Sequence, residues 1–400
     1  MTTTPQFAVI GAGPLGSTTA RYLAEAGASV VLIGPGDPGD VIDPSKPWGG
    51  WSDESRMFHA VDLPLASAIL AKRSRARFAD IEERSGVRFT TANPSLTVSG
   101  MVKSDRTSGI EIDTHFDIAT LMNNATDVGI DVQRIEPDEL ARRHPNLRFN
   151  EGHFALHHAD GLVLNPRRFV EAQQVLAERA GAERILDHVT SIEDDAEGVT
   201  VGLAGGGQVR AEQIVLAAGA HINLDGLLPR RLETMVLGIT IALFEVDEGT
   251  EFFPTLMYAD VSSPHPYSGL IVPPLRYPDG KLYLKFAGTG GLRIITSKKE
   301  ATEWLAAGGD TEGAENMIHA LRQLMPDLTV HSTVTRPCLA TMNHANTPYI
   351  GHVVDRIVVL TEGDHGVTVG DEAGRLAADL ALTGIWRDSL PARLFTPRFA

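Results

Sequence analysis

Two patterns in the sequence predict a mixed α/β (α+β) fold with two kinds of sheet. Residues 7–33 read as a strand, a glycine-rich turn, a helix and a second strand, which is typical of the βαβ unit of a Rossmann-like domain. From residue 233 onward, strand-like segments separated by proline and glycine dominate, which indicates an antiparallel sheet. Further strands and a last helix follow near the C-terminus. We therefore expect a discontinuous nucleotide-binding domain with a β-rich domain inserted in it.

The glycine-rich turn is the strongest local signal. Residues 7–10 form an apolar run short enough for a buried strand, and the glycines that follow have the G-x-G-x-x-G spacing. Gly11 permits the tight turn, Gly13 lets the backbone approach a pyrophosphate, and Gly16 lets the helix pack close to the strand. The N-terminus of that helix would offer its N–H groups to the phosphate. A glycine-rich turn without a nucleotide is the alternative, and the strand–turn–helix context disfavours it.

One part of this fingerprint is missing. The second strand usually ends in Asp or Glu, which binds the ribose hydroxyls, but the corresponding residue is Gly34. Asp37 follows three residues later and is the candidate replacement.

Composition narrows the class of protein. The 400-residue chain is 43% hydrophobic and carries 35 basic against 51 acidic residues, a net charge of −16. No basic block points to nucleic acid, and an anionic membrane surface should repel the chain. Cys338 is the single cysteine, so an internal disulfide is impossible. We expect no signal peptide, no membrane span, a cytoplasmic location and a monomer.

The remaining elements follow from periodicity and from turn residues. The loop over residues 34–50 is too long for a plain connector and is a candidate cofactor or lid segment. Pro166 is placed to start a helix, glycines 205–207 turn a hairpin, and the small residues that end the strand at 214–220 suggest backbone close to a ligand. We expect helices over residues 62–85, 112–124, 137–143, 167–181, 312–325 and 372–382. We expect strands over residues 89–101, 132–135, 184–192, 199–203, 214–220, 236–244, 256–259, 270–272, 282–286, 334–340, 349–352 and 357–361.

A histidine cluster lies at residues 153–158. His153, His157 and His158 could ligate a metal, but no cysteine or carboxylate completes an evident ligand spacing. A loop or strand end near the pocket is the favoured interpretation.

Four separated segments together resemble the FAD-dependent amine oxidases of the D-amino-acid oxidase superfamily, most closely the group of monomeric sarcosine oxidase and N-methyltryptophan oxidase. They are residues 11–16 with their βαβ unit, residues 52–59, residues 215–220, and the C-terminal segments 336–341, 348–351 and 364–368. Residues 52–59 resemble the family's loop beneath the flavin. The resemblance implies that FAD lies extended, with its pyrophosphate at the glycine-rich turn and its isoalloxazine ring between the two domains.

The resemblance also implies a set of cofactor-binding residues. The set consists of Gly11, Gly13, Pro14, Leu15, Gly16, Asp37, Ser52, Ser55, Arg56, Met57, Val189, Ala218, Gly219, Cys338, Leu339, Gly363, Asp364, His365, Gly366, Val367 and Thr368. Cys338 is a candidate for a covalent bond to the flavin, because the family links FAD to a cysteine in a Cys-x-Tyr-Thr context. Here Cys338 and Thr341 match that context, while Ala340 replaces the tyrosine.

The candidate catalytic residues are Lys285, Arg56, His59 and Thr368. Lys285 lies between Leu284 and Phe286 in a strand like that of the family's oxygen-activating lysine, and alternation would direct its ammonium group toward the pocket. His59 and Thr368 stand where the sarcosine oxidase group has an arginine and a lysine that grip the substrate carboxylate. Arg276, Arg293 or Arg336 could bind the substrate carboxylate from another direction instead.

The resemblance implies a discontinuous Rossmann-like FAD-binding domain, with an inserted antiparallel β-sheet substrate domain. We assign residues 1–88, 150–228 and 330–400 to the FAD-binding domain and residues 89–149 and 229–329 to the substrate domain. The expected reaction is oxidation of a C–N bond in a secondary amine or amino-acid-like substrate by dioxygen, giving imine and hydrogen peroxide, with sarcosine itself a poor substrate. The alternatives are a flavin dehydrogenase with another electron acceptor, a non-catalytic FAD-binding subunit and, as a minor reading, a NAD-dependent dehydrogenase.

Overall fold

The computed structural model describes residues 4–37, 39, 42–61, 64–99, 118–149, 152–250, 253–260, 267–363 and 365–400. The N-terminal parts of the helices expected over residues 62–85 and 112–124 reach outside these ranges, as does the end of the strand region expected over residues 89–101. None of the helices in the described ranges is long and apolar enough to cross a membrane.

A six-stranded sheet forms the centre of the first domain. Its strand order is β19 (Ile350–Val354), β20 (Ile357–Leu360), β13 (Gln213–Leu216), β1 (Phe7–Ile10), β2 (Val30–Ile33) and β9 (Glu183–Ile185). All neighbours pair in parallel except β19, which is antiparallel to β20. The sheet combines segments from both ends and the middle of the chain, which confirms the predicted discontinuous Rossmann-like fold.

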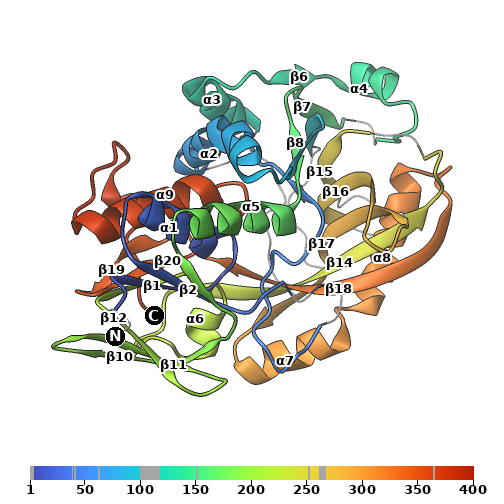
Figure 1. Cartoon of the computed structure of the whole chain (residues 1–400). Coiled ribbons are helices and arrows are strands. Elements are labelled where there is room, and N and C mark those ends of the chain that lie inside the picture. Colours follow the sequence, from blue (N-terminus) through green and yellow to red (C-terminus); the bar gives the residue numbers. More distant parts are fainter. Residues whose placement is uncertain are drawn as a thin grey trace.

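Both faces of this sheet are covered, which explains the uninterrupted apolar strands. Phe7 and Val9 of β1 face the helices α1 (Pro14–Glu25) and α9 (Gly370–Thr383), and α5 (Pro166–Arg179) packs beside α1 (Figure 1). Ala8 and Ile10 face the opposite way, toward a three-stranded meander. The meander consists of β10 (Val189–Asp195), β11 (Gly198–Leu203) and β12 (Gln208–Ala211).

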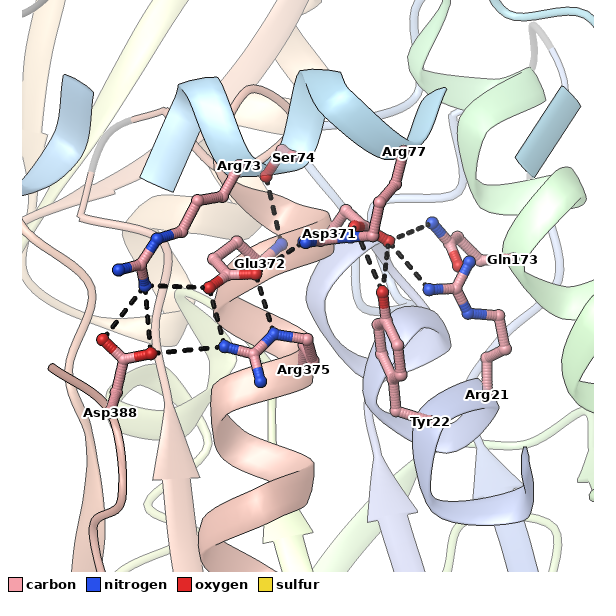
Figure 2. A network of polar contacts seen from close by, with 10 residues as sticks. All are labelled: Arg21, Tyr22, Arg73, Ser74, Arg77, Gln173, Asp371, Glu372, Arg375 and Asp388. Atoms are coloured by element: carbon pink, nitrogen blue, oxygen red, sulfur yellow. Dashed lines mark hydrogen bonds and ion pairs between the residues drawn. The ribbon is translucent and has the colours of Figure 1, made fainter. Parts of the chain in front are cut away.

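A buried polar network ties the helices of this domain together (Figure 2). Asp371 of α9 is fully buried and accepts hydrogen bonds from Arg21 of α1 at 2.9 Å, from Arg77 of α2 (Leu65–Ser85) at 2.5 Å and from Gln173 of α5 at 3.3 Å. The carboxylate of its neighbour Glu372 pairs with Arg73, Arg77 and Arg375. The backbone N–H of Glu372 donates to Oγ of Ser74 on α2 at 3.0 Å. The four helices therefore meet at two adjacent carboxylates.

An eight-stranded sheet forms the second domain. Its order is β18 (Val330–Met342), β14 (Met235–Val246), β17 (Leu282–Ile295), β16 (Tyr267–Arg276), β15 (Thr255–Asp260), β5 (Ser95–Ser99), β7 (Phe154–His158) and β6 (Gln133–Ile135). All neighbours are antiparallel except β15 and β5. Helix α8 (Thr311–Leu324) covers one face, where Met317 and Leu321 pack against Phe244 and Phe286. The predicted β-rich domain is thus present, and its other face is free to line a site.

The remaining elements are short or lie at the edges. A small sheet contains β3 (Arg56–Met57), β8 (Leu162–Leu164) and β4 (Thr90–Ala92). The other helices are α3 (Ile118–Val128), α4 (Pro137–Arg143), α6 (His221–Leu224), α7 (Lys298–Ala307) and a 3₁₀ turn at Ala392–Leu394.

Several predicted elements have different bounds in the structure. The strand expected over residues 184–192 is two strands, β9 and β10, which belong to different sheets. The strand expected over residues 214–220 ends at Leu216, and the strand expected over residues 282–286 continues to Ile295. Helix α7 was not predicted, although Ser297 caps it by accepting the N–H of Glu300.

Candidate active site

A long cavity of about 470 Å³ runs between the two domains. At one end it is lined by the glycine-rich turn after β1, and at the other by the free face of the eight-stranded sheet, including Lys285 of β17. Segments 47–52, 217–221 and 365–368 line it in between. Its size is ordinary for a site that binds a small organic molecule.

The glycine-rich turn is built by close backbone contacts. Gly11 has a φ of +105°, and a Cβ there would lie 2.3 Å from the carbonyl oxygen of Ala217. A Cβ on Gly16 would lie 1.8 Å from the carbonyl oxygen of Gly11, so this glycine serves the packing of helix on turn. Helix α1 begins at the cavity with Gly13 as its N-cap, no side-chain cap and no acidic residue in its first turn. This arrangement fits an anionic group such as a pyrophosphate.

Close packing explains why position 34 is a glycine and not an acidic residue. A Cβ at this position would lie 2.5 Å from the backbone nitrogen of Ala12, so the end of β2 touches the glycine-rich turn directly. Asp37, the candidate replacement for the missing acid, does not line the cavity. Its carboxylate accepts the N–H of Gly39 at 2.9 Å and lies 3.4 Å from Nε of Arg167. Its role in ribose binding therefore stays a prediction that this geometry does not favour.

The structure brings most of the predicted site residues to the cavity wall. Those that line it are Gly11, Gly13, Pro14, Leu15, Ser52, Arg56, Met57, His59, Val189, Ala218, Gly219, Lys285, Cys338, Leu339, His365, Gly366, Val367 and Thr368. Gly16, Asp37, Ser55 and Gly363 do not line it, and Asp364 lies outside the described residues. Gly363 has a φ of +59°, and a Cβ there would lie 2.4 Å from the backbone of Thr347, so its close approach is to the chain itself.

Lys285 is buried in an ion pair that the sequence did not reveal. Its Nζ donates to Oδ2 of Asp53 at 2.5 Å and to the carbonyl oxygen of Ser55 at 2.5 Å. Arg56 pairs with the same Oδ2, while the other oxygen of Asp53 accepts the Tyr277 hydroxyl at 3.1 Å and the N–H of Glu54 at 2.8 Å. Lys285 and Asp53 are each only 1% exposed. One buried carboxylate thus holds both cations of the candidate site.

The charges of this cluster set its ionisation. Burial opposes the ionisation of Asp53, but the adjacent Lys285 and Arg56 cations outweigh it and lower the pKa of that carboxyl. Burial lowers the pKa of Lys285 to about 8; Arg56 acts in the same direction, and Asp53 opposes both. Burial and the negative charge of Asp53 raise the pKa of the Tyr277 hydroxyl, which therefore acts as a hydrogen-bond donor to the carboxylate.

His59 and Thr368 lie together, although 309 positions separate them in the chain. The backbone N–H of His59 donates to Oγ1 of Thr368 at 3.3 Å, and its ring stacks on that of His365 with centroids 3.9 Å apart. Both residues line the cavity, where they present an imidazole and a hydroxyl.

Three arginines were considered as alternative binding partners of a substrate carboxylate, and none of them lines the cavity. Arg276 forms an exposed ion pair with Glu248, and Arg293 is exposed on β17. Arg336 is half-buried on β18. Within the described residues, the cations on the cavity wall are Lys285 and Arg56, and Asp53 pairs with both.

Cys338 lies on β18 at the cavity wall, and its thiol donates to the carbonyl oxygen of Gly50 at 3.8 Å. Burial, with Glu362 and Asp53, raises the pKa of the thiol, while Arg56 and Lys285 act in the opposite direction. Glu362 also lines the cavity and accepts the N–H of Thr341 at 2.7 Å.

The histidines of residues 153–158 do not contribute to this cavity. His157 and His158 belong to β7. Within the described residues, no group of three or more His, Cys, Asp or Glu side chains is arranged to hold a metal ion.

A buried hydroxyl on the cavity wall fits a polar ligand. Oγ of Ser52 is buried and has no hydrogen-bond partner among the described residues, although Ser52 lines the cavity. An unpartnered buried hydroxyl costs free energy unless a ligand or water satisfies it. Together with the uncapped start of α1, this makes the donor set suitable for an extended cofactor with a phosphate and polar ring atoms.

Sequence reasoning missed several residues of the site. Asp53 is the anion of the ion-pair cluster, and Tyr277 donates a hydrogen bond to it. Trp48 in the long loop and Trp51 directly after it line the cavity. The length of that loop was a general signal for Trp48 and Trp51. No periodicity or spacing pointed to Asp53, because its partner is 232 positions away.

The Rossmann-like sheet and the glycine-rich turn at the start of α1 place the chain in the class of dinucleotide-binding proteins, and its cavity extends from that turn to a buried lysine. The family comparison agrees. Residues 6–380 match the DAO family, described as FAD dependent oxidoreductase, and the chain belongs to this family.

Its relatives are distant in sequence. The chain is 24% identical to N-methyl-L-tryptophan oxidase of Salmonella arizonae over 388 residues, which cover 94% of each chain. It is 25% identical to monomeric sarcosine oxidase of Streptomyces avermitilis, covering 100% of this chain and 98% of that one. Among solved structures, NikD, an unusual amino acid oxidase essential for nikkomycin biosynthesis, superposes with a TM-score of 0.77 at 20% identity, covering 100% and 98% of the two chains. Glycine oxidase from Geobacillus kaustophilus gives a TM-score of 0.70 at 19% identity, covering 99% and 98%.

Proposed function

We propose that this protein is an FAD-dependent oxidase of a C–N bond in an amine, giving imine and hydrogen peroxide. The observation that carries the proposal is the single cavity that joins the glycine-rich turn to the buried Lys285. The relatives support the reaction class, because their names are those of oxidases that act on amines or amino acids. The runner-up is a flavin dehydrogenase that passes electrons to another acceptor.

When bound, FAD would supply the two-electron oxidation of the C–N bond and the transfer of those electrons to dioxygen. The chain would bind the pyrophosphate with the turn at Gly11 and Gly13 and the N-terminus of α1, and the adenosine end beside Val189. Ser52, Met57, Leu339 and residues 365–368 would hold the ring system. Asp37 and Asp364 belong to this proposal only by family resemblance.

Lys285 would place a fixed positive charge where dioxygen is reduced, which stabilises the negative charge that develops there. Arg56 would add to this charge. The apolar wall of β14, β16 and β17, including Ile241, Leu270 and Ala287, would exclude water from the reacting C–N bond.

Anaerobic bleaching of the purified protein tests the function. We expect a yellow protein with about one FAD per chain, whose colour bleaches with a suitable amine and returns with air, releasing peroxide. Bleaching that only an artificial acceptor reverses would favour the dehydrogenase. A yellow protein that no amine bleaches would favour a non-catalytic subunit, and a colourless protein that FAD cannot reconstitute would overturn the proposal.

We further propose the division into a FAD-binding domain of residues 1–88, 150–228 and 330–400 and a substrate domain of residues 89–149 and 229–329. The two sheets support most of this division, but β7 and β18 lie in segments assigned to the FAD-binding domain and are strands of the eight-stranded sheet. Strand β8 pairs with β3 from one domain and β4 from the other.

We propose that the substrate is an amine larger than sarcosine or one that lacks an α-carboxylate. His59 and Thr368 would leave that group without a permanent cation, and a buried carboxylate without a partner costs several kcal/mol. We expect sarcosine and simple N-methyl amino acids to give a kcat/KM below about 10⁴ M⁻¹s⁻¹, an ordinary value for an enzyme acting on its own substrate. Steady-state kinetics on matched amines with and without the carboxylate measures this difference.

A charge-restoring variant provides the matched control. His59→Arg with Thr368→Lys should raise kcat/KM for the carboxylated amine by about tenfold or more, because a hydrogen bond to a charged group contributes roughly 1.5–3 kcal/mol. Efficient turnover of sarcosine by the unaltered protein would show that another residue binds the carboxylate.

We also propose that Cys338 bonds covalently to the flavin. The proposal rests on its place at the cavity wall and on the family context, which Cys338 and Thr341 match, although Ala340 replaces the tyrosine. Acid precipitation should leave the flavin colour in the protein pellet, and Cys338→Ser should release it into the supernatant. A colourless pellet from the unaltered protein would contradict the bond, and a coloured pellet from Cys338→Ser would assign it to another residue.

A further inference from the structure

We propose that Asp53 is a positioning residue. Its carboxylate holds the Lys285 ammonium group at the cavity wall and cancels one of the two positive charges that Lys285 and Arg56 bring there. This inference rests on the proposed function for its role in the reaction, but the ion pair itself can be tested without turnover.

The Asp53 carboxylate is buried and hydrogen-bonded at both of its oxygens. Its oxygens accept from four groups: Lys285 and Arg56 at Oδ2, and Tyr277 and the N–H of Glu54 at Oδ1. A charge at 1% exposure is costly unless it is paired and hydrogen-bonded, and this carboxylate has both kinds of partner. The Tyr277 hydroxyl also lies 3.3 Å from Oγ of Ser55, which ties the hairpin after β16 to the segment that carries Asp53.

The consequence for Lys285 is a fixed orientation. An ammonium has three N–H donors, and Asp53 and the carbonyl of Ser55 accept two of them at 2.5 Å. Because Lys285 lines the cavity, the third donor remains for a molecule there. The residues opposite Lys285 on β14 and β16, Leu243 and Val272, are apolar and cannot hold the ammonium in place of Asp53.

The titratable neighbours of Lys285 determine the net charge of the cluster. The titratable groups that face Lys285 are Asp53 and Arg56 from segment 52–57, Cys338 from β18 and, through Asp53, Tyr277. With Asp53 ionised, the cluster of Lys285, Arg56 and Asp53 carries a net charge of +1. Asp53→Asn would leave two cations together, which disfavours the protonated form of Lys285.

A direct titration of Lys285 tests the role of Asp53. The chain contains seven lysines, so NMR of the purified protein with ¹³C-labelled lysine can follow each side chain, and the Lys285 signal is identified by its absence in Lys285→Met. In the unaltered protein we expect Lys285 to titrate near pH 8. In Asp53→Asn the midpoint should fall by about 1–3 pH units, the usual effect of an adjacent opposite charge. Asp53→Glu should restore most of the shift.

Asp388→Asn is the matched control, because it removes one negative charge from the polar network of the first domain, where Asp388 pairs with Arg73 and Arg375 and does not line the cavity. It should leave the Lys285 midpoint unchanged. An unchanged midpoint in folded Asp53→Asn would overturn the proposal. Absence of flavin in the purified protein would count against the proposed function and not against this pairing.

A second variant covers failure of Asp53→Asn to fold. The pair Asp53→Asn with Lys285→Met removes both members of the Lys285–Asp53 ion pair, while Arg56 keeps its hydrogen bonds to the carbonyl oxygens of Gly50 and Ser55. This variant should therefore recover the fold. If the pair also fails to fold while Lys285→Met folds, Asp53 serves the fold and not the lysine, and the proposal is overturned.

Discussion

Lys285→Met is expected to slow the reoxidation of the reduced protein by dioxygen by about 10²–10³-fold, the usual cost of removing one group that stabilises developing negative charge. Methionine has a similar length and no charge, so the cavity wall keeps its shape while the ammonium group is lost. Reduction by the amine should fall much less, because that half-reaction does not need the charge. Stopped-flow measurement of the two half-reactions separately, the first without oxygen, resolves them.

Lys281→Met is the control for this experiment. Lys281 lies four residues before Lys285 on the same hairpin, is exposed, and pairs with Glu245 at 2.7 Å, so its loss should change neither rate. Equal losses in both half-reactions of Lys285→Met would instead indicate that the lysine supports the structure of the site.

The nucleotide end of the site could be predicted from the sequence because its determinants are local. Gly11, Gly13 and Gly16 lie within six consecutive residues, and at Gly11 and Gly16 a side chain would strike neighbouring backbone. Lys285 could be placed for a similar reason: Leu284 and Phe286 pack against α8, so strand alternation directs the lysine to the cavity.

The partners of these residues could not be predicted. Asp53 meets Lys285 only because the loop after residue 50 crosses the free face of the eight-stranded sheet, and this crossing is a property of the tertiary fold. Gly34 shows the same limit. Its sequence position suggests a lost ribose ligand, whereas the structure shows that a side chain there would strike Ala12. The split of residues 184–192 into β9 and β10 was also hidden, because both halves have strand-like sequences and only their sheets differ.

The network of buried carboxylates between the helices was equally invisible in the sequence. Asp371 and Arg21 are 350 positions apart, and acidic residues at the start of a helix such as α9 usually indicate only a favourable interaction with the helix dipole. In the structure Asp371 lies at the junction of α1, α2 and α5 (Figure 2). It is 2.9 Å from the buried Arg21, whereas Glu25, the other carboxylate near this arginine, is 3.8 Å away.

Asp371→Asn is therefore expected to lower the free energy of unfolding by about 3–5 kcal/mol, because it keeps the shape of the side chain but removes the one carboxylate that is hydrogen-bonded to the buried Arg21 among the described residues. The measurement is urea denaturation followed by far-UV circular dichroism, with the midpoint compared between variants. Asp80→Asn on α2 is the control: Asp80 is 62% exposed in its pair with Arg84, and such a surface pair contributes at most about 1 kcal/mol. Similar urea midpoints for the two variants would contradict this prediction. They would mean that the surrounding arginines and Tyr22 rearrange to compensate, and that the network does not stabilise the packing of the helices as its geometry indicates.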